Sequence, residues 1–81
     1  MGTSQADIRG WLKRAPKGAT HMLVVCDTFD YSDYPIFVMP EQDVHAEADK
    51  RNGPNMTRLM EVYNLSMDLE KQLAQGRSFN Y

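Results

Sequence analysis

Residues 24–38 read VVCDTFDYSDYPIFV, and this stretch decides the fold because two apolar runs enclose a short segment of turn-forming residues. Valine, isoleucine and aromatic residues favour an extended chain, whereas aspartate and serine favour turns. We therefore predict strands at residues 21–29 and 34–39 that pair as an antiparallel hairpin across the sequence DYSD. Pro35 has no backbone N–H to donate, so it should lie at the start or the edge of the second strand.

A helix is predicted before the hairpin, over residues 4–14. Ser4 provides a capping signal at its start. Ile8, Trp11 and Leu12 follow at the spacing that places apolar side chains on one face of a helix.

Two further helices are predicted after the hairpin, at residues 41–51 and 55–75. The first is short and exposed, with acidic residues early and basic residues late, which suits the helix dipole. The second is the longest element and would begin at Asn55, a favourable N-cap residue. Its apolar residues recur at helical spacing in two stripes, Leu59, Val62, Leu69 and Leu73, and Met56, Met60, Tyr63 and Met67.

The predicted order α-β-β-α-α describes a small α+β domain, with the hairpin packed against the long C-terminal helix. The chain has 81 residues, which is enough for a single domain over residues 1–81. Its one cysteine, Cys26, allows no internal disulfide and suits the reducing cytoplasm. A net charge of −2 disfavours general nucleic-acid binding. No apolar run approaches the roughly 18 residues that would span a bilayer, so we expect no membrane contact.

Self-association is expected because the first strand is apolar on both faces. Alternate residues point to opposite sides, so Met22 and Val24 face one way while Leu23 and Val25 face the other. A hairpin and a long helix are too few elements to cover both faces, and a second copy would supply the rest. The alternative is a compact monomer in which the aromatic tail covers the second face.

Seven residues are candidates for ligand binding. Aromatic rings stack on flat ligands, and carboxylates accept hydrogen bonds from sugar hydroxyls or base amines. An arginine beside a helix N-terminus suits a phosphate. The candidates are Asp27, Thr28, Phe29, Tyr31 and Tyr34 from the hairpin, with Asn55 and Arg58 from the start of the long helix.

Structural roles for the same residues remain open. The aspartates could simply form the turn. Asp27 follows an apolar run, so its carboxylate needs a partner, which Arg58 or a backbone cap would provide. His21, Cys26 and His45 show no zinc or nucleophile spacing, so we expect no catalytic residue, no metal and no cofactor, and an enzyme is the least supported class.

Two stretches, THMLVVCDTFDYSDYPIFV and NMTRLMEVYNLSMDLEKQL, resemble small uncharacterised proteins encoded in tailed-bacteriophage genomes. Those proteins also carry a Cys-Asp-Thr-Phe-Asp stretch, an Asp-Tyr-Pro turn and a Met-Glu-Val-Tyr helix. The resemblance covers residues 8–75 and brings no established activity with it. It implies a viral protein acting in the bacterial host cytoplasm, where small phage proteins often disable host defences.

In that setting we expect a homo-oligomeric, non-enzymatic anti-defence protein. The leading hypothesis is a sponge that sequesters a small nucleotide-derived signalling molecule in a pocket between subunits. The alternative is a protein–protein inhibitor that blocks a host protein with the acidic, aromatic tip of the hairpin. A hydrolase of a nucleotide signal that uses Asp27 or His45 ranks last, because the sequence shows no second acid–base residue at a spacing that indicates a catalytic pair.

Overall fold

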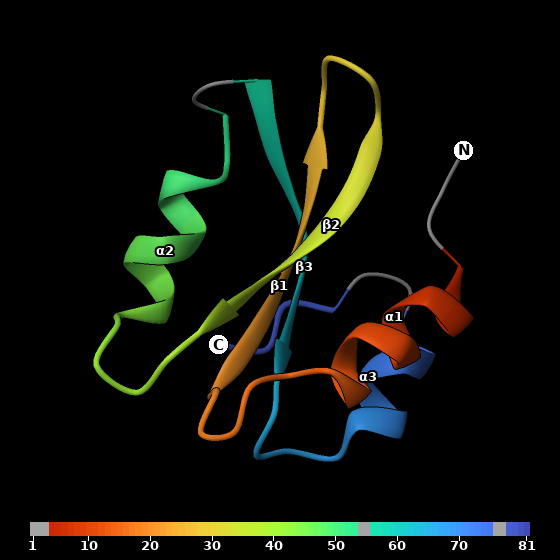
Figure 1. Cartoon of the computed structure of the whole chain (residues 1–81), viewed down its shortest axis with the longest axis vertical. Helices are drawn as coiled ribbons and strands as arrows, with labels where there is room; N and C mark the ends of the chain where they lie inside the picture. The colour runs from red at the N-terminus through yellow and green to blue at the C-terminus, as the bar shows by residue number, and fades with distance from the viewer. Residues whose placement is uncertain (1–3, 54–55, 76–77) are drawn as a thin grey trace.

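The computed structural model of the chain describes residues 4–53, 56–75 and 78–81. Its three strands form one antiparallel sheet in the order β2-β1-β3, with β1 at the centre (Figure 1). The expected α+β class is confirmed, and the order of elements is α-β-β-α-β-α rather than α-β-β-α-α. The elements are α1 (Gln5–Lys13), β1 (His21–Asp27), β2 (Ser32–Val38), α2 (Val44–Lys50), β3 (Thr57–Asn64) and α3 (Leu69–Ala74).

The hairpin expected from residues 24–38 is present. β1 and β2 pair from His21 opposite Val38 to Asp27 opposite Ser32. β2 lies at an edge of the sheet, so the proline within it, Pro35, occupies an edge strand as expected.

The long helix expected over residues 55–75 is wrong. Residues 57–64 form β3 instead, and the α-helix in this stretch, α3, has six residues. Asp68 caps α3 by accepting hydrogen bonds from the backbone N–H groups of Glu70 and Lys71. Asn55, the expected N-cap, lies outside the described residues.

A β-bulge explains why β3 imitates a helix in the sequence. Val24 of β1 faces Glu61, whereas its neighbour Val25 faces Leu59, so Met60 is an extra residue on β3. An extra residue breaks the strict alternation of a strand. The apolar residues before and after Met60 therefore fall at intervals of three and four, which is the pattern that indicates a helix.

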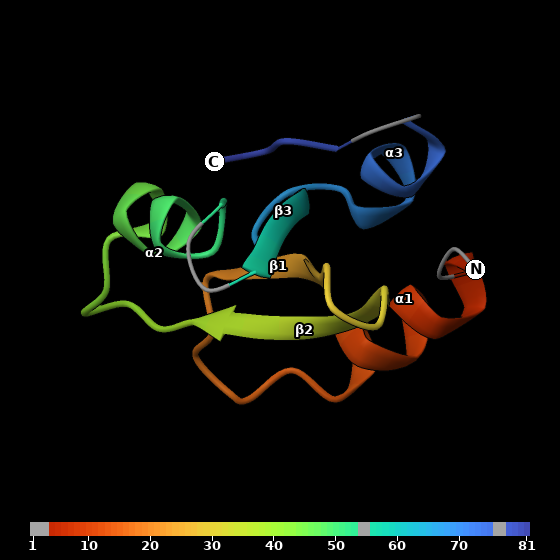
Figure 2. The ribbon, with the colours of Figure 1, turned by 90° about the horizontal axis from the view of Figure 1, so that it is seen from above.

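Both faces of the sheet are covered within one chain, with α2 on one side and α1 and α3 on the other (Figure 2). Val44 and Ala48 of α2 belong to the first cluster, whose strand residues are Leu23, Val25, Val38, Leu59 and Val62. The second cluster is built around Ile8, Met22, Val24, Tyr63 and Leu73. Because β1 finds apolar partners on both sides inside the chain, a second copy is not needed to cover it, and self-association stays a prediction.

The last four residues of the chain lie beside the outer edge of β3. The Val62 N–H donates to the Ser78 carbonyl at 2.6 Å, and the Asn80 N–H donates to the Val62 carbonyl at 3.0 Å. The ring of Tyr81 stacks on that of His45 in α2, with centroids 4.3 Å apart. The aromatic tail therefore packs against the edge of β3 and against α2. It does not cover the second face of the sheet, which the monomer alternative expected it to cover.

A buried glutamine, Gln72, forms hydrogen bonds with the backbone of Asn64 at the same outer edge of β3, two residues after Val62. The side-chain amide of Gln72 accepts from the Asn64 N–H at 2.7 Å and donates to the Asn64 carbonyl at 2.9 Å. Gln72 is only 2% exposed, and its amide also donates to the Asp68 carbonyl at 3.2 Å. The Gln72 amide thus takes the place that a peptide group of a neighbouring strand would occupy.

Candidate functional site

Three large apolar side chains are exposed at one end of the sheet. Phe29 and Tyr31, in the turn between β1 and β2, are 77% and 69% exposed, and Met56, directly before β3, is 53% exposed. The turn and the start of β3 share this end, at the top of Figure 1, because β1 is antiparallel to both of its neighbours. We call Phe29, Tyr31 and Met56 the loop surface. Large apolar side chains exposed at the same end of a sheet are candidates for a contact surface.

Hydrogen bonds fix the segments that carry the loop surface. The backbone N–H and the hydroxyl of Thr28 both donate to the Met56 carbonyl, at 2.8 and 2.9 Å. The Tyr31 N–H donates to the Asp27 carbonyl at 2.6 Å, and the Asp27 carboxylate accepts from the Phe29 N–H at 2.8 Å. The backbone cap that the sequence offered as a partner for Asp27 is therefore present.

Two residues of the loop surface have a left-handed backbone. Tyr31 has φ of 59° and Met56 has φ of 60°. Left-handed conformations are uncommon for residues other than glycine, cost about 1–3 kcal/mol and persist only where the surroundings hold them in place. Such strain concentrates at binding sites, so it supports a functional role for this end of the sheet.

An acidic group lies within the same turn. The exposed carboxylate of Asp30 accepts from the Ser32 hydroxyl at 2.7 Å and from the Ser32 N–H at 3.0 Å. These hydrogen bonds lower the pKa of Asp30 below its usual value. Asp30 is therefore ionised at neutral pH and places a negative charge beside the aromatic rings.

The structure places five of the seven predicted ligand-binding residues at this end, namely Asp27, Thr28, Phe29 and Tyr31 on the hairpin and Arg58 on β3. Tyr34 lies on β2 and packs against the buried cluster beneath α2, away from the loop surface. Arg58 is exposed on β3 opposite Cys26, so the expectation that it follows a helix N-terminus is wrong. Asn55 falls outside the described residues, and its predicted role is not addressed by the structure.

Met56 is the member of the loop surface that the sequence analysis missed. Its spacing relative to Met60 and Tyr63 assigns it to an apolar stripe of a helix. The sequence NGPN just before it is a strong turn signal, and an apolar residue next to a turn is a candidate for exposure.

Cys26 lies between Asp33 and Arg58 across the three strands. Burial raises the pKa of the Cys26 thiol, the hydrogen bond and charge of Asp33 and the charge of Asp27 raise it further, and the charge of Arg58 lowers it. The thiolate, which is the reactive form, is therefore scarce at neutral pH. This thiol suits a structural residue better than a nucleophile.

We expect the substitution Asp33→Asn to lower the pKa of Cys26, because it removes a negative charge and a hydrogen bond that disfavour the thiolate. At mildly alkaline pH, alkylation by iodoacetamide should become several-fold faster, and the rate–pH curve should move to lower pH. Asp30→Asn is the matched control and should leave the curve unchanged. Equal curves for Asp33→Asn and the parent protein would contradict this account of the thiol.

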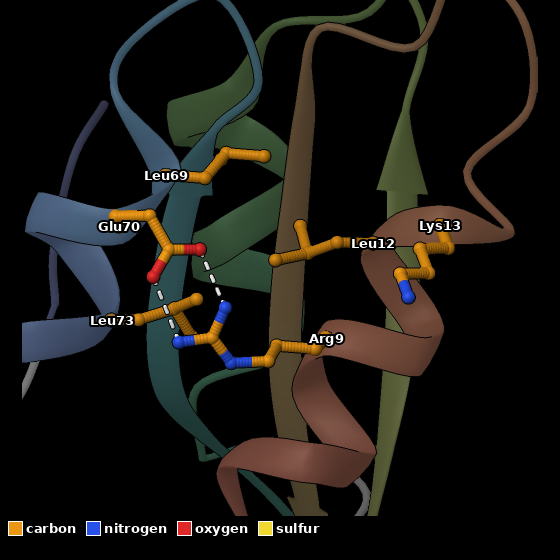
Figure 3. Close-up of a pocket in the computed structure, with 6 residues that line it drawn as sticks. All are labelled: Arg9, Leu12, Lys13, Leu69, Glu70 and Leu73. Atoms are coloured by element: carbon orange, nitrogen blue, oxygen red, sulfur yellow. Dashed lines mark hydrogen bonds and ion pairs between the residues drawn. The ribbon is translucent and has the colours of Figure 1, made fainter.

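A groove of about 240 Å³ lies away from the loop surface, between α1 and α3 (Figure 3). Leu12, Leu69 and Leu73 provide its apolar lining, and Arg9, Lys13 and Glu70 provide its charged groups. None of these six residues is among the predicted ligand-binding residues. Leu69, Glu70 and Leu73 fall within the supposed long helix, so the sequence does not indicate that they meet α1.

Over residues 4–53, 56–75 and 78–81, no group of three or more histidine, cysteine, aspartate or glutamate side chains is placed to hold a metal ion. None of the helices in these ranges is both long enough and apolar enough to cross a membrane.

No protein-family model matches this chain, and no curated protein or solved structure matches it significantly. The phage setting and the anti-defence role therefore stay predictions.

Proposed function

We propose that the protein is a non-enzymatic binding protein that blocks another protein through its loop surface. The observation that carries this proposal is the exposure of Phe29, Tyr31 and Met56 at one end of the sheet. Aromatic side chains that a partner takes up supply much of the binding energy at protein interfaces. In the phage setting, the partner would be a protein of the bacterial host.

The rigidity of the loop surface supports the same function. Thr28 ties the turn to Met56 through two hydrogen bonds, and Asp27 holds the backbone of Phe29 and Tyr31. A surface ordered before binding loses less conformational entropy when it meets its partner. Such a surface favours insertion into an existing pocket over folding upon binding.

The charge beside the aromatic rings indicates the chemistry of the partner. Asp30 is exposed and its pKa is held low by hydrogen bonds from Ser32, so it carries a negative charge. A fitting partner has an apolar pocket with lysine or arginine at its rim, and charge complementarity of this kind raises the association rate. Binding should therefore weaken as the salt concentration rises.

We expect single substitutions in the loop surface to weaken capture of a host protein from bacterial lysate at least tenfold. The variants are Phe29→Ser, Met56→Ser and Tyr31→Asn, the last of which retains a residue that tolerates a left-handed backbone. Each replaces an exposed side chain, so the fold should be kept. Binding is measured by surface plasmon resonance once the captured protein is purified.

Met67→Ser is the matched control for Met56→Ser. Met67 is 52% exposed and Met56 is 53% exposed, but Met67 follows β3 and lies at the opposite end of the sheet. Met67→Ser should change the affinity less than threefold. Equal losses for the two methionines, or capture that survives all three loop-surface variants, would remove the support for this function.

Sequestration of a nucleotide-derived signal is the second candidate. Arg58 is exposed at the same end of the sheet as the turn, so its guanidinium could pair with a phosphate while Phe29 or Tyr31 stacks on a base. Calorimetry with cyclic dinucleotides and ADP-ribose derivatives tests this function, and light scattering tests the homo-oligomer that it requires. A folded monomer that binds none of these compounds would exclude it.

A further inference from the structure

We propose that the groove between α1 and α3 binds a small carboxylic acid with an aliphatic chain, such as a free medium-chain fatty acid. The groove is separate from the loop surface, and neither proposed function uses it. Its volume of about 240 Å³ lies just below the range of about 300–1,000 Å³ found for pockets that hold drug-sized ligands. A ligand of modest size therefore fits it.

The walls of the groove are held together by contacts between the two helices. The side-chain amide of Gln5 donates to the Leu73 carbonyl at 2.7 Å. One turn further along α1, the two guanidinium nitrogens of Arg9 donate to the two carboxylate oxygens of Glu70 at 2.5 and 2.8 Å (Figure 3). These contacts join the two helices that form the walls of the groove.

The charges on the rim are unbalanced. Gln5, Arg9 and Lys13 recur every four residues, so they share one face of α1. The first two have partners on α3, whereas Lys13 has no hydrogen-bond or ion-pair partner within the part of the chain that the structure describes. The residues that line the groove therefore include two cations and one carboxylate, and the carboxylate of a ligand would balance the charge of this lining.

The interior of the groove selects the other end of the ligand. Leu12, Leu69 and Leu73 line it, and Figure 3 shows their side chains between the two helices. Burying an aliphatic chain against them removes apolar surface from water, which favours binding. A carboxylate near Arg9 and Lys13, with its chain against the leucines, satisfies both parts of the groove.

Three ligands of equal chain length separate the contribution of the charged head group from that of the aliphatic chain. We expect octanoate to bind at least fivefold more tightly than octanol, and octylammonium to bind most weakly. Titration of the full chain, followed by amide chemical shifts in NMR, should move signals of α1 and α3 and leave those of the β1–β2 turn unchanged.

Two substitutions with opposite effects sharpen the test. Lys13→Gln should weaken octanoate binding several-fold, whereas Lys17→Gln, on an exposed residue outside the groove, should not. Glu70→Gln should strengthen it, because Glu70 competes with the ligand carboxylate for Arg9. A purely apolar groove would respond to neither change.

Several outcomes would overturn this assignment. Equal affinities for the three ligands, shifts centred on the loop surface, or no binding at millimolar octanoate would each do so. A leucine-terminated dipeptide that binds more tightly than octanoate would show that the groove takes a peptide carboxyl terminus rather than a free fatty acid.

Discussion

Replacing Gln72 with leucine should lower the free energy of unfolding by about 3 kcal/mol, because the N–H and carbonyl of Asn64 lose their hydrogen-bond partner. Leucine is of similar size, so the loss comes from unsatisfied polar groups rather than from a cavity. For a domain of this length, such a loss lowers the melting temperature by about 12 °C or more. Urea unfolding measures it as a lower midpoint with an unchanged slope.

Gln75→Leu is the control for this experiment. Gln75 follows α3 and is exposed, and its side chain accepts an exposed hydrogen bond from the Asn80 amide at 3.3 Å, so its replacement should change stability by no more than about 1 kcal/mol. Gln72→Glu should resemble Gln72→Leu, because a carboxylate cannot donate to the Asn64 carbonyl. If Gln72→Leu were as stable as Gln75→Leu, the glutamine would not be completing the edge of β3.

Introducing a carboxylate at Ala48 should destabilise the chain by at least about 3 kcal/mol, because an unpaired charge would be buried between α2 and the sheet. Ala48 is 2% exposed and belongs to the cluster beneath α2. The substitution Ala48→Asp therefore tests whether α2 covers this face within one chain. Thermal unfolding by circular dichroism provides the measurement.

The same substitution two residues earlier serves as the comparison. Ala46 lies in the first turn of α2 and is exposed, so Ala46→Asp should change stability by no more than about 1 kcal/mol. Similar melting temperatures for Ala46→Asp and Ala48→Asp would mean that α2 does not pack on the sheet in solution.

The hairpin and α1 could be predicted because their signals are local. Strand-forming residues flank DYSD, and Ser4 caps α1 through a reciprocal pair of hydrogen bonds with Asp7. The short helix at 41–51 was also predictable, since Asp43 caps α2 and Val44 and Ala48 form its thin apolar face. Each of these elements is specified by residues only a few positions apart.

β3 could not be predicted because its identity depends on a distant strand. Glu61 and Leu59 face consecutive residues of β1, and only that register reveals Met60 as the extra residue. Read without its partner strand, the spacing from Met56 to Met67 is helical. Tertiary pairing thus overrides the periodic signal, as it often does for strands.

The candidate site divides in the same way. Asp27, Thr28, Phe29 and Tyr31 are neighbours in the chain, so the sequence could place them together. Met56 joins them only through its hydrogen bonds with Thr28, 28 positions away. Likewise, the groove unites Arg9 with Glu70, residues 61 positions apart, and no local motif indicates such a meeting.

Pro35 has a consequence for the behaviour of the molecule at high concentration. It lies in the middle of β2, an edge strand that pairs only with β1 among the residues that the structure describes. Exposed margins of this kind recruit further copies and can grow into fibrils, and a proline interrupts the row of main-chain donors that such growth needs. A valine at this position would restore an unbroken row of donors along the seven residues of β2, so we expect Pro35→Val to form amyloid-like aggregates more readily than the parent protein.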